Sequence, residues 1–330
     1  MPSLLRRRET VLAIIIAVLL IAISLRAPVF LSAGSLDTLI TDSAILAIMA
    51  LAQLLALITR GIDLSVAANM ALTGMITALL SHAFPTMPIA LTLGIALGVG
   101  LALGAINGVL IAWLEMPPIV VTLGTMSIYR GMVFAIGPRV DAHQLGAQFI
   151  AFPNERLLGV THIVWIAALV VAAEYVFFHH LRRGRELYAL GGNPAAARYV
   201  GIDAARVKLL VYLGTGLLSG LCGYLVVARY AVAYTETALG FEMQTIAACV
   251  IGGVSIAGGR GTVAGCLLGT AFLVIIFNAL PIIVSPFWQM AISGTSILIT
   301  VIVNSRSERR RGKHILAPAA GVTPRTEAPC

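Results

Sequence analysis

Isolated polar side chains recur within long apolar stretches of this sequence, and the chemistry they offer is hydrogen bonding. Most are amides or hydroxyls, namely Asn69, Asn107, Thr122, Thr125, Tyr129, Gln244 and Asn278. Such groups can bind a neutral polar molecule. In hydrocarbon an unpartnered polar group is costly, so each of them must face a cavity or a partner. Taken singly, each is better explained by a hydrogen bond between helices.

The motifs do not indicate catalysis. The sequence has no HExxH motif, paired carboxylates or Cys/His nucleophile arrangement. A phosphate-binding P-loop is also missing, because Lys208 and Lys313 precede residues other than Ser or Thr. Gly259-x-Gly261-x-x-Ala264 resembles a dinucleotide fingerprint, but no charged residue follows it before Ser305 to bind a ribose. We therefore expect no enzyme activity, no catalytic residue, no metal site and no cofactor.

The composition places these polar residues in a membrane protein. The 330 residues are 59% hydrophobic and 11% charged, with a mean hydropathy of +0.98, far outside the range of soluble domains. A helix needs roughly 17–25 mostly apolar residues to cross a bilayer. Ten stretches meet this condition, at residues 11–29, 43–59, 62–81, 88–113, 117–136, 161–181, 207–227, 243–258, 261–280 and 288–304. The expected fold is all-α, a polytopic membrane protein with about ten transmembrane helices.

Basic residues are distributed unevenly between the alternate loops of this arrangement. With the N-terminus inside, seventeen of the 22 Lys and Arg residues lie on the inner side and four on the outer side. Because short basic loops stay cytoplasmic, both termini are expected to be cytoplasmic. Residues 1–305 would form the transmembrane domain, and residues 306–330 a basic, flexible cytoplasmic tail. A cleaved signal peptide at residues 6–25 is the competing interpretation.

The largest cytoplasmic loop, residues 182–206, has sequence features of a pair of short helices. Asn193 suits an N-cap, Pro194 suits the first helical position, and Gly201 can end the helix in the left-handed conformation. Residues 185–190 could form a preceding helical turn closed by Gly191 and Gly192. On physical grounds alone, two interpretations are equal: a surface that another protein approaches closely, or a solvated connection.

Several stretches together resemble one known family. GRELYALGGNPAAARYVGI, at residues 184–202, closely resembles the cytoplasmic coupling segment of permease subunits from bacterial ABC importers of monosaccharides, the ribose, xylose, arabinose and galactose group. RGIDLSVAANMALTG (60–74), GAINGVLIAWLEMPPIVVTLGTMSIYRG (104–131) and FEMQTIAACVIGGVSIAGGRGTVAGCLLG (241–269) agree with that family. Within the group, VVTLGTMSIYRG, VDAHQ and SPFWQMAISGT are most similar to rhamnose permeases, with autoinducer-2 permeases close. Ala67 departs from the family's usual glycine after LSV.

The resemblance implies a non-catalytic transport subunit in the bacterial inner membrane. A separate cytoplasmic ATP-binding-cassette ATPase would hydrolyse ATP, and a periplasmic sugar-binding protein would deliver the monosaccharide. A second permease subunit would complete the membrane part; lipid is the other partner, and no nucleic acid is expected. The resemblance implies contact with the ATPase within residues 182–206, through Gly184, Arg185, Glu186, Gly191, Gly192, Asn193, Pro194, Ala197, Gly201 and Ile202.

Further roles follow from the same resemblance. A neutral sugar needs hydroxyl and amide partners, so some of the polar residues within the spans would line a translocation pathway, and we expect fewer than half to do so. Arg60 and Asp63, near the cytoplasmic surface, are expected to form a structural ion pair. The outer segments 137–160 and 229–242 would meet the binding protein, through Asp141, His143, Glu155, Arg156 and Glu236.

A secondary transporter driven by protons or sodium is the main alternative from another class. Such carriers commonly place carboxylates near the bilayer centre and repeat their architecture. This chain offers Glu174 and Asp63 within or beside spans, neither of them central, and has no convincing repeat. ABC permeases for autoinducer-2, nucleosides or branched-chain amino acids share the expected architecture and stay open as alternatives.

Overall fold

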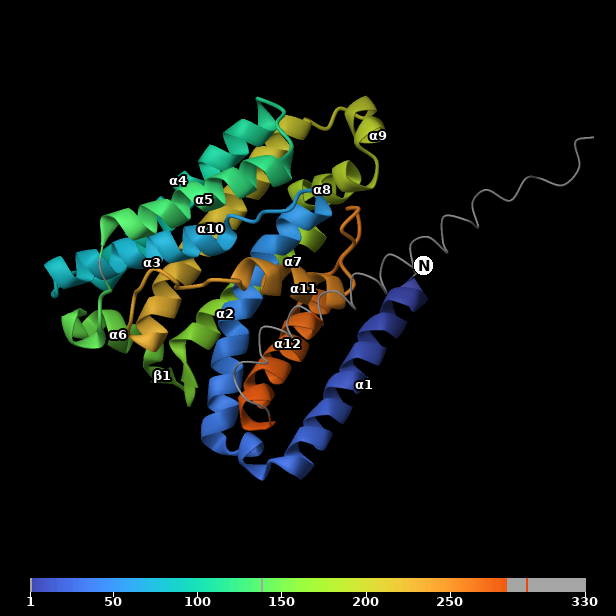
Figure 1. Ribbon diagram of the computed structural model, residues 1–330. Coiled ribbons are helices and arrows are strands. Elements are labelled where there is room, and N and C mark those ends of the chain that lie inside the picture. Colours follow the sequence, from blue (N-terminus) through green and yellow to red (C-terminus); the bar gives the residue numbers. More distant parts are fainter. Residues whose placement is uncertain (1, 138, 284–294, 296–330) are drawn as a thin grey trace, which may run out of the picture.

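The computed structural model is an array of helices whose long members pack along one another (Figure 1), and it describes residues 2–137, 139–283 and 295. The helices are α1 (Pro2–Arg26), α2 (Ala33–Ile58), α3 (Val66–Ala83), α4 (Ile89–Ala112), α5 (Pro118–Ile136), α6 (Ala147–Asn154), α7 (His162–His180), α8 (Arg182–Gly192), α9 (Pro194–Tyr199), α10 (Ala204–Tyr230), α11 (Phe241–Ile251) and α12 (Val263–Ile283). Two 3-10 turns, η1 (Pro28–Leu31) and η2 (Ala142–Gln144), and a hairpin of β1 (Arg156–Leu157) with β2 (Val160–Thr161) complete the described elements.

Seven of the described helices are long and apolar enough to cross a membrane: α1 from Glu9 onward, α2, α3, α4, α5, α7 and α10. They correspond to the first seven predicted spans. The structure therefore confirms a mainly helical, polytopic membrane protein. Apart from residue 295, the tenth predicted span, residues 288–304, lies outside the described residues, as does the tail, residues 306–330.

The eighth predicted span, residues 243–258, is not a single long helix. α11 has 11 residues, which at 1.5 Å per residue is only about half of a hydrocarbon core about 30 Å thick. The chain leaves the helix where Gly253, Gly258 and Gly259 adopt positive φ values of 92°, 83° and 69°, a region in which glycine carries no Cβ penalty. α11, this glycine-rich loop and α12 therefore replace a simple hairpin of two full spans.

Contacts gather the loops at two ends of the molecule. At one end, Gly259 N donates to the Ile58 carbonyl (2.8 Å), and Thr262 Oγ1 donates to Glu9 Oε1 (2.7 Å). Figure 1 shows α8, α9 and the start of α1 at this same end. At the other end, Arg156 pairs with Asp37 (2.8 Å) beside the hairpin. If successive spans cross the membrane in opposite directions, alternate loops must lie at the same end, as these contacts place them.

Glycines allow α4 and α10 to approach each other closely. A Cβ on Gly104 of α4 would lie 2.8 Å from the Gly216 Cα of α10, and a Cβ on Gly100 would lie 2.6 Å from the Gly220 Cα. On each helix the two glycines lie four residues apart and therefore share one face, so the two backbones touch along a stripe without side chains. α10 packs against α4, α3 and α2, and thereby forms the centre of the core together with α2.

Candidate functional site

The loop at residues 182–206 folds into the two short helices that its sequence predicts. α8 ends at Gly192, and the Asn193 side chain caps α9 by accepting a hydrogen bond from Ala196 N (3.1 Å). Pro194 occupies the first position of α9, and Gly201 adopts φ +79° immediately after it. The structure confirms the predicted start and end of α9. These could be predicted because capping residues and left-handed terminators act on backbone groups only a few residues away.

The helix pair lies at the edge of the molecule (Figure 1). Some of its residues are buried against the protein and others are exposed. The buried side contains Gly184, Glu186, Gly191 and Ala197. The exposed side contains Arg185, Gly192, Asn193 and Gly201; Pro194 and Ile202 are half-buried. Tyr199 and Val200, which sequence analysis did not select, are 92% and 76% exposed. Because the large side chains of Tyr199 and Val200 are exposed to solvent next to Arg198, this side is suited to contact with another protein.

Arg60 fastens the end of α8 to the end of α2. Its Nε donates to the Gly191 carbonyl (2.6 Å), and its Nη2 donates to the Gly192 carbonyl (2.9 Å). Arg60 adopts a positive φ of 65° just beyond α2. A guanidinium at a helix C-terminus satisfies carbonyls that have no partner inside the helix and complements the negative end of the dipole. Arg60 therefore joins two segments that are far apart in the sequence.

The predicted ion pair between Arg60 and Asp63 is not formed. Asp63 is buried and uses both carboxylate oxygens elsewhere: Oδ1 accepts from Ser65 N (3.0 Å) and Ser65 Oγ (2.6 Å), and Oδ2 accepts from Thr215 Oγ1 (2.7 Å). Asp63 thus fixes the α2–α3 loop to α10, while Arg60 points to α8. Three residues of separation brought the pair close in sequence, but the left-handed turn at Arg60 directs the two side chains to different partners.

The loop between α11 and α12 completes this junction. Tyr188 Oη of α8 donates to the Gly261 carbonyl (2.9 Å), and Gly259 N donates to the Ile58 carbonyl at the end of α2. Burial and, secondarily, the negative charge of Glu174 raise the pKa of Tyr188 to about 12, so the phenol keeps its proton and remains a donor. A displacement of α8 would consequently move or break its contacts with the end of α2 and with the α11–α12 loop at the same time.

The polar residues predicted for a pathway separate into two groups. Asn69, Asn107, Thr122, Thr125 and Tyr129 are buried between helices or bonded within one. Asn69 Nδ2 donates to the Gly100 carbonyl (3.2 Å), and Tyr129 Oη donates to the Leu103 carbonyl (2.8 Å). The acceptors in both bonds are backbone carbonyls of the neighbouring helix α4, so these side chains hold helices together. Gln244 and Asn278, in contrast, line a cavity.

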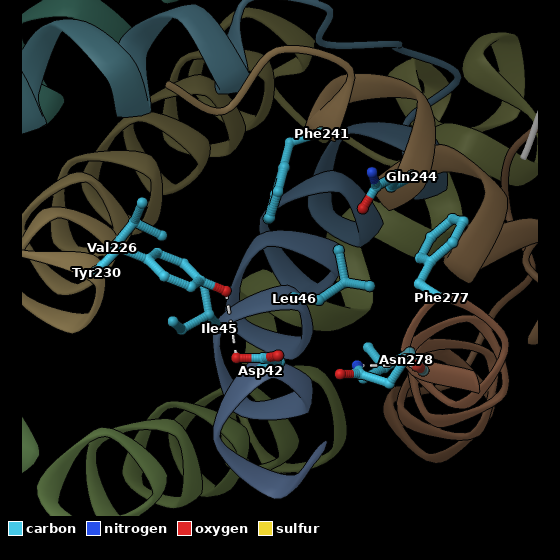
Figure 2. A pocket seen from close by; sticks show the side chains of 10 residues that line it. Asp42, Ile45, Leu46, Val226, Tyr230, Phe241, Gln244, Phe277 and Asn278 are labelled. Carbon is cyan, nitrogen blue, oxygen red and sulfur yellow. Dashed lines mark hydrogen bonds between the residues drawn. The ribbon is translucent and has the colours of Figure 1, made fainter. Parts of the chain in front are cut away.

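The cavity lies between α2, α10, α11 and α12 and has a volume of about 470 Å³. Figure 2 shows Asp42 and Tyr230 on one part of its wall and Gln244 and Asn278 on another. Asp42 was not among the predicted pathway residues, because the second predicted span begins at residue 43, whereas α2 begins at Ala33. An acidic residue directly before an apolar run is the signal that could have revealed it. Polar groups on a partly apolar wall suit a small hydroxylated molecule.

The two outer segments predicted to meet another protein form one surface. Val140 and Ala233 exchange backbone hydrogen bonds (2.8 and 2.9 Å), and Asn154 Nδ2 donates to the Ala228 carbonyl (2.9 Å). Arg130 of α5 donates to the Thr235 and Thr237 carbonyls (3.1 and 2.8 Å). Of the five predicted docking residues, four are exposed and Asp141 is half-buried beside Arg139; the four are His143, Glu155, Arg156 and Glu236.

Seven helices long enough to cross a membrane, a cavity lined by polar and apolar side chains, and an exposed helix pair at one end are compatible with a membrane transport protein. The chain belongs to the family described as branched-chain amino acid transport system / permease component, whose model matches residues 35–301. It is a multi-pass protein of the bacterial inner membrane. No solved structure matches the chain.

Relatives of this chain are named as import permeases for sugars or for autoinducer 2. The chain is 36% identical to the ribose import permease protein RbsC of Escherichia coli K12, over 89% of this chain and 93% of the relative. It is 33% identical to the galactose/methyl galactoside import permease protein MglC of Salmonella typhimurium LT2, with 92% and 96% coverage. It is 31% identical to the autoinducer 2 import system permease protein LsrC of Escherichia coli K12 DH10B, with 84% and 81% coverage. The resemblance to permease subunits of bacterial monosaccharide ABC importers is thereby confirmed.

Proposed function

We propose that this chain is the membrane-spanning permease of an ATP-binding-cassette importer that translocates a monosaccharide. A separate cytoplasmic ATPase drives it through α8 and α9, a periplasmic binding protein delivers the sugar, and a second permease subunit completes the channel. Residues 1–305 form the transmembrane domain, and the basic residues 306–330 form a cytoplasmic tail. The observation that carries the proposal is the α8–α9 pair, which is exposed on one side and fixed to α2 by Arg60 on the other.

Rhamnose or a related sugar is the proposed substrate. The support is the similarity of VVTLGTMSIYRG, at residues 120–131, and VDAHQ, at residues 140–144, to rhamnose permeases; the third similar stretch, at residues 285–295, lies almost entirely outside the described part. Relatives named for ribose and galactose import support the wider sugar class. Autoinducer 2 is the second candidate, on the similarity to LsrC.

The substrate is tested with the whole complex. Permease, ATPase and binding protein are reconstituted in liposomes, and ATP hydrolysis is measured with L-rhamnose, ribose, galactose, autoinducer 2 and leucine. We expect a monosaccharide, with L-rhamnose the strongest, to raise hydrolysis several-fold, because loaded binding protein favours the ATPase-active state. Stimulation by leucine alone would refute sugar import, and stimulation by autoinducer 2 alone would select the second candidate.

Reversing the charge of Glu236 is expected to weaken delivery by the binding protein. Glu236 is exposed on the joined outer surface, where charge complementarity mainly sets the rate of association. In Glu236→Lys the concentration of binding protein that gives half-maximal ATPase stimulation should rise roughly three- to tenfold. Glu115→Lys, an equal charge reversal at an exposed position between α4 and α5, is the control. Equal values for the two variants would argue against the assigned surface.

A further inference from the structure

The cavity between α2, α10, α11 and α12 contains a carboxylate to which neither the motifs nor the comparisons assign a role. Asp42 of α2 faces the cavity, and its Oδ1 accepts the hydroxyl hydrogen of Tyr230 (3.3 Å) from α10. A carboxylate has about four lone-pair positions, so one phenol leaves acceptor capacity for a bound molecule. Tyr230 thus orients the carboxylate without saturating it.

The surroundings of Asp42 favour a neutral partner over a cation. Arg229, next to Tyr230 on α10, interacts electrostatically with Asp42 and compensates part of its charge. The facing wall carries the amides of Gln244 and Asn278, which are neutral donors and acceptors. Figure 2 shows the Asn278 side chain extending toward Asp42 across the cavity. An amine would find one partly compensated charge, whereas a hydroxylated molecule would find acceptors and donors together.

The volume and the aromatic lining of the cavity agree with the same class of ligand. Phe241 and Phe277 present rings to the cavity, and aromatic faces suit the C–H surface of a sugar ring. The cavity volume of about 470 Å³ lies within the roughly 300–1,000 Å³ of small-molecule sites. A monosaccharide could therefore place one face on a ring and its hydroxyls against Asp42 and the amides.

We propose that Asp42, oriented by Tyr230, contacts the transported sugar and selects for a particular hydroxyl group. This inference rests on the proposed function and adds a specificity-determining residue to it. Hydrogen bonds to a charged acceptor are stronger than neutral ones, and a site built to bind a hydroxyl discriminates strongly against an analogue that lacks it. Removing the carboxylate should consequently abolish discrimination between a sugar and the corresponding deoxy sugar.

The test separates selection by the permease from selection by the binding protein. The reconstituted complex is supplied with binding protein fully loaded with L-rhamnose, ribose or each of their monodeoxy analogues, and the translocation rate is measured in a single turnover. Wild type is expected to move one parent sugar at least about tenfold faster than one of its analogues. In Asp42→Ala this ratio should fall to nearly one. Ser43→Ala, the neighbouring position on α2 outside the cavity, should keep the wild-type ratio.

Other outcomes of this experiment would contradict either the role of Asp42 or the proposed function. An unchanged ratio in Asp42→Ala, or a wild type that moves every analogue as fast as its parent, would overturn the role of Asp42 while leaving sugar import intact. If Asp42→Ala does not assemble, Tyr230→Phe removes only the hydrogen bond that orients the carboxylate, and an unchanged ratio there would overturn the inference. A wild type that translocates no sugar at all would refute the proposed function, and the role of Asp42 with it.

Discussion

Substituting Gly191 by alanine is expected to reduce ATP-driven sugar uptake at least tenfold in a protein that still inserts into the membrane. The Cα of Gly191 lies against the end of α2, where an added Cβ would overlap the Ile58 carbonyl oxygen and lie 2.7 Å from Gly259 N. Backbone cannot yield as a flexible side chain does, so α8 would have to move away from α2 and from Arg60. The junction that carries movement from the helix pair into the membrane would open.

The neighbouring glycine supplies the control for this prediction. A Cβ on Gly192 would meet nothing within 4 Å, so Gly192→Ala changes the same chemistry one residue away without disturbing the junction. Uptake and ATP hydrolysis are measured side by side in the reconstituted complex. We expect Gly191→Ala to hydrolyse ATP with little transport. In Gly192→Ala the contact between α8 and α2 is intact, so the amount of sugar transported per ATP hydrolysed should keep its wild-type value even if contact with the ATPase is altered. An equal loss of transport per ATP in the two variants would show that close contact between α8 and α2 is not needed for coupling.

Gly104→Ala is expected to destabilise the fold itself. A Cβ there would overlap the Tyr212 carbonyl oxygen and lie 2.8 Å from the Gly216 Cα, both on α10. Overpacking of this kind typically costs about 1–3 kcal/mol and more where backbone must shift. Since α10 lies at the centre of the core, separating it from α4 would also disturb α3 and α2.

The same substitution at Gly98 is the matched comparison, because a Cβ there would meet nothing within 4 Å. The midpoint temperature of unfolding is measured for both purified variants in detergent. Gly104→Ala should unfold several degrees below wild type, whereas Gly98→Ala should match it or exceed it slightly, since alanine is the better helix former. Identical midpoints would mean that the α4–α10 contact contributes little to stability.

Local patterns allowed much of the fold to be predicted from the sequence. Apolar stretches predicted the long helices, and Asn193, Pro194 and Gly201 predicted α9, since capping depends only on neighbouring residues. Glycines spaced four residues apart lie on one face of a helix and favour close packing, but only the structure shows that those of α4 meet those of α10. The break after α11 was not predicted, because composition alone placed Gly252, Gly253 and Gly258 within an apolar stretch at residues 243–258.

Features that depend on distant contacts could not be predicted in this way. Arg60 binds the backbone carbonyls of Gly191 and Gly192, and a carbonyl has no signature in the sequence. The nearest carboxylate in sequence, Asp63, was therefore chosen as its partner and proved wrong. Polar residues within spans look alike whether they face a helix or a cavity, so Gln244 could not be separated from Asn69 until the helices were placed.

The central claim is that this permease is a passive gate moved by a separate ATPase through α8 and α9. The most direct measurement is the accumulation of radiolabelled L-rhamnose and ribose in liposomes that contain the permease, with binding protein on the periplasmic side. Accumulation above the supplied concentration is expected only when the ATPase subunit and ATP are both present. Accumulation against a gradient by the permease alone would contradict the account.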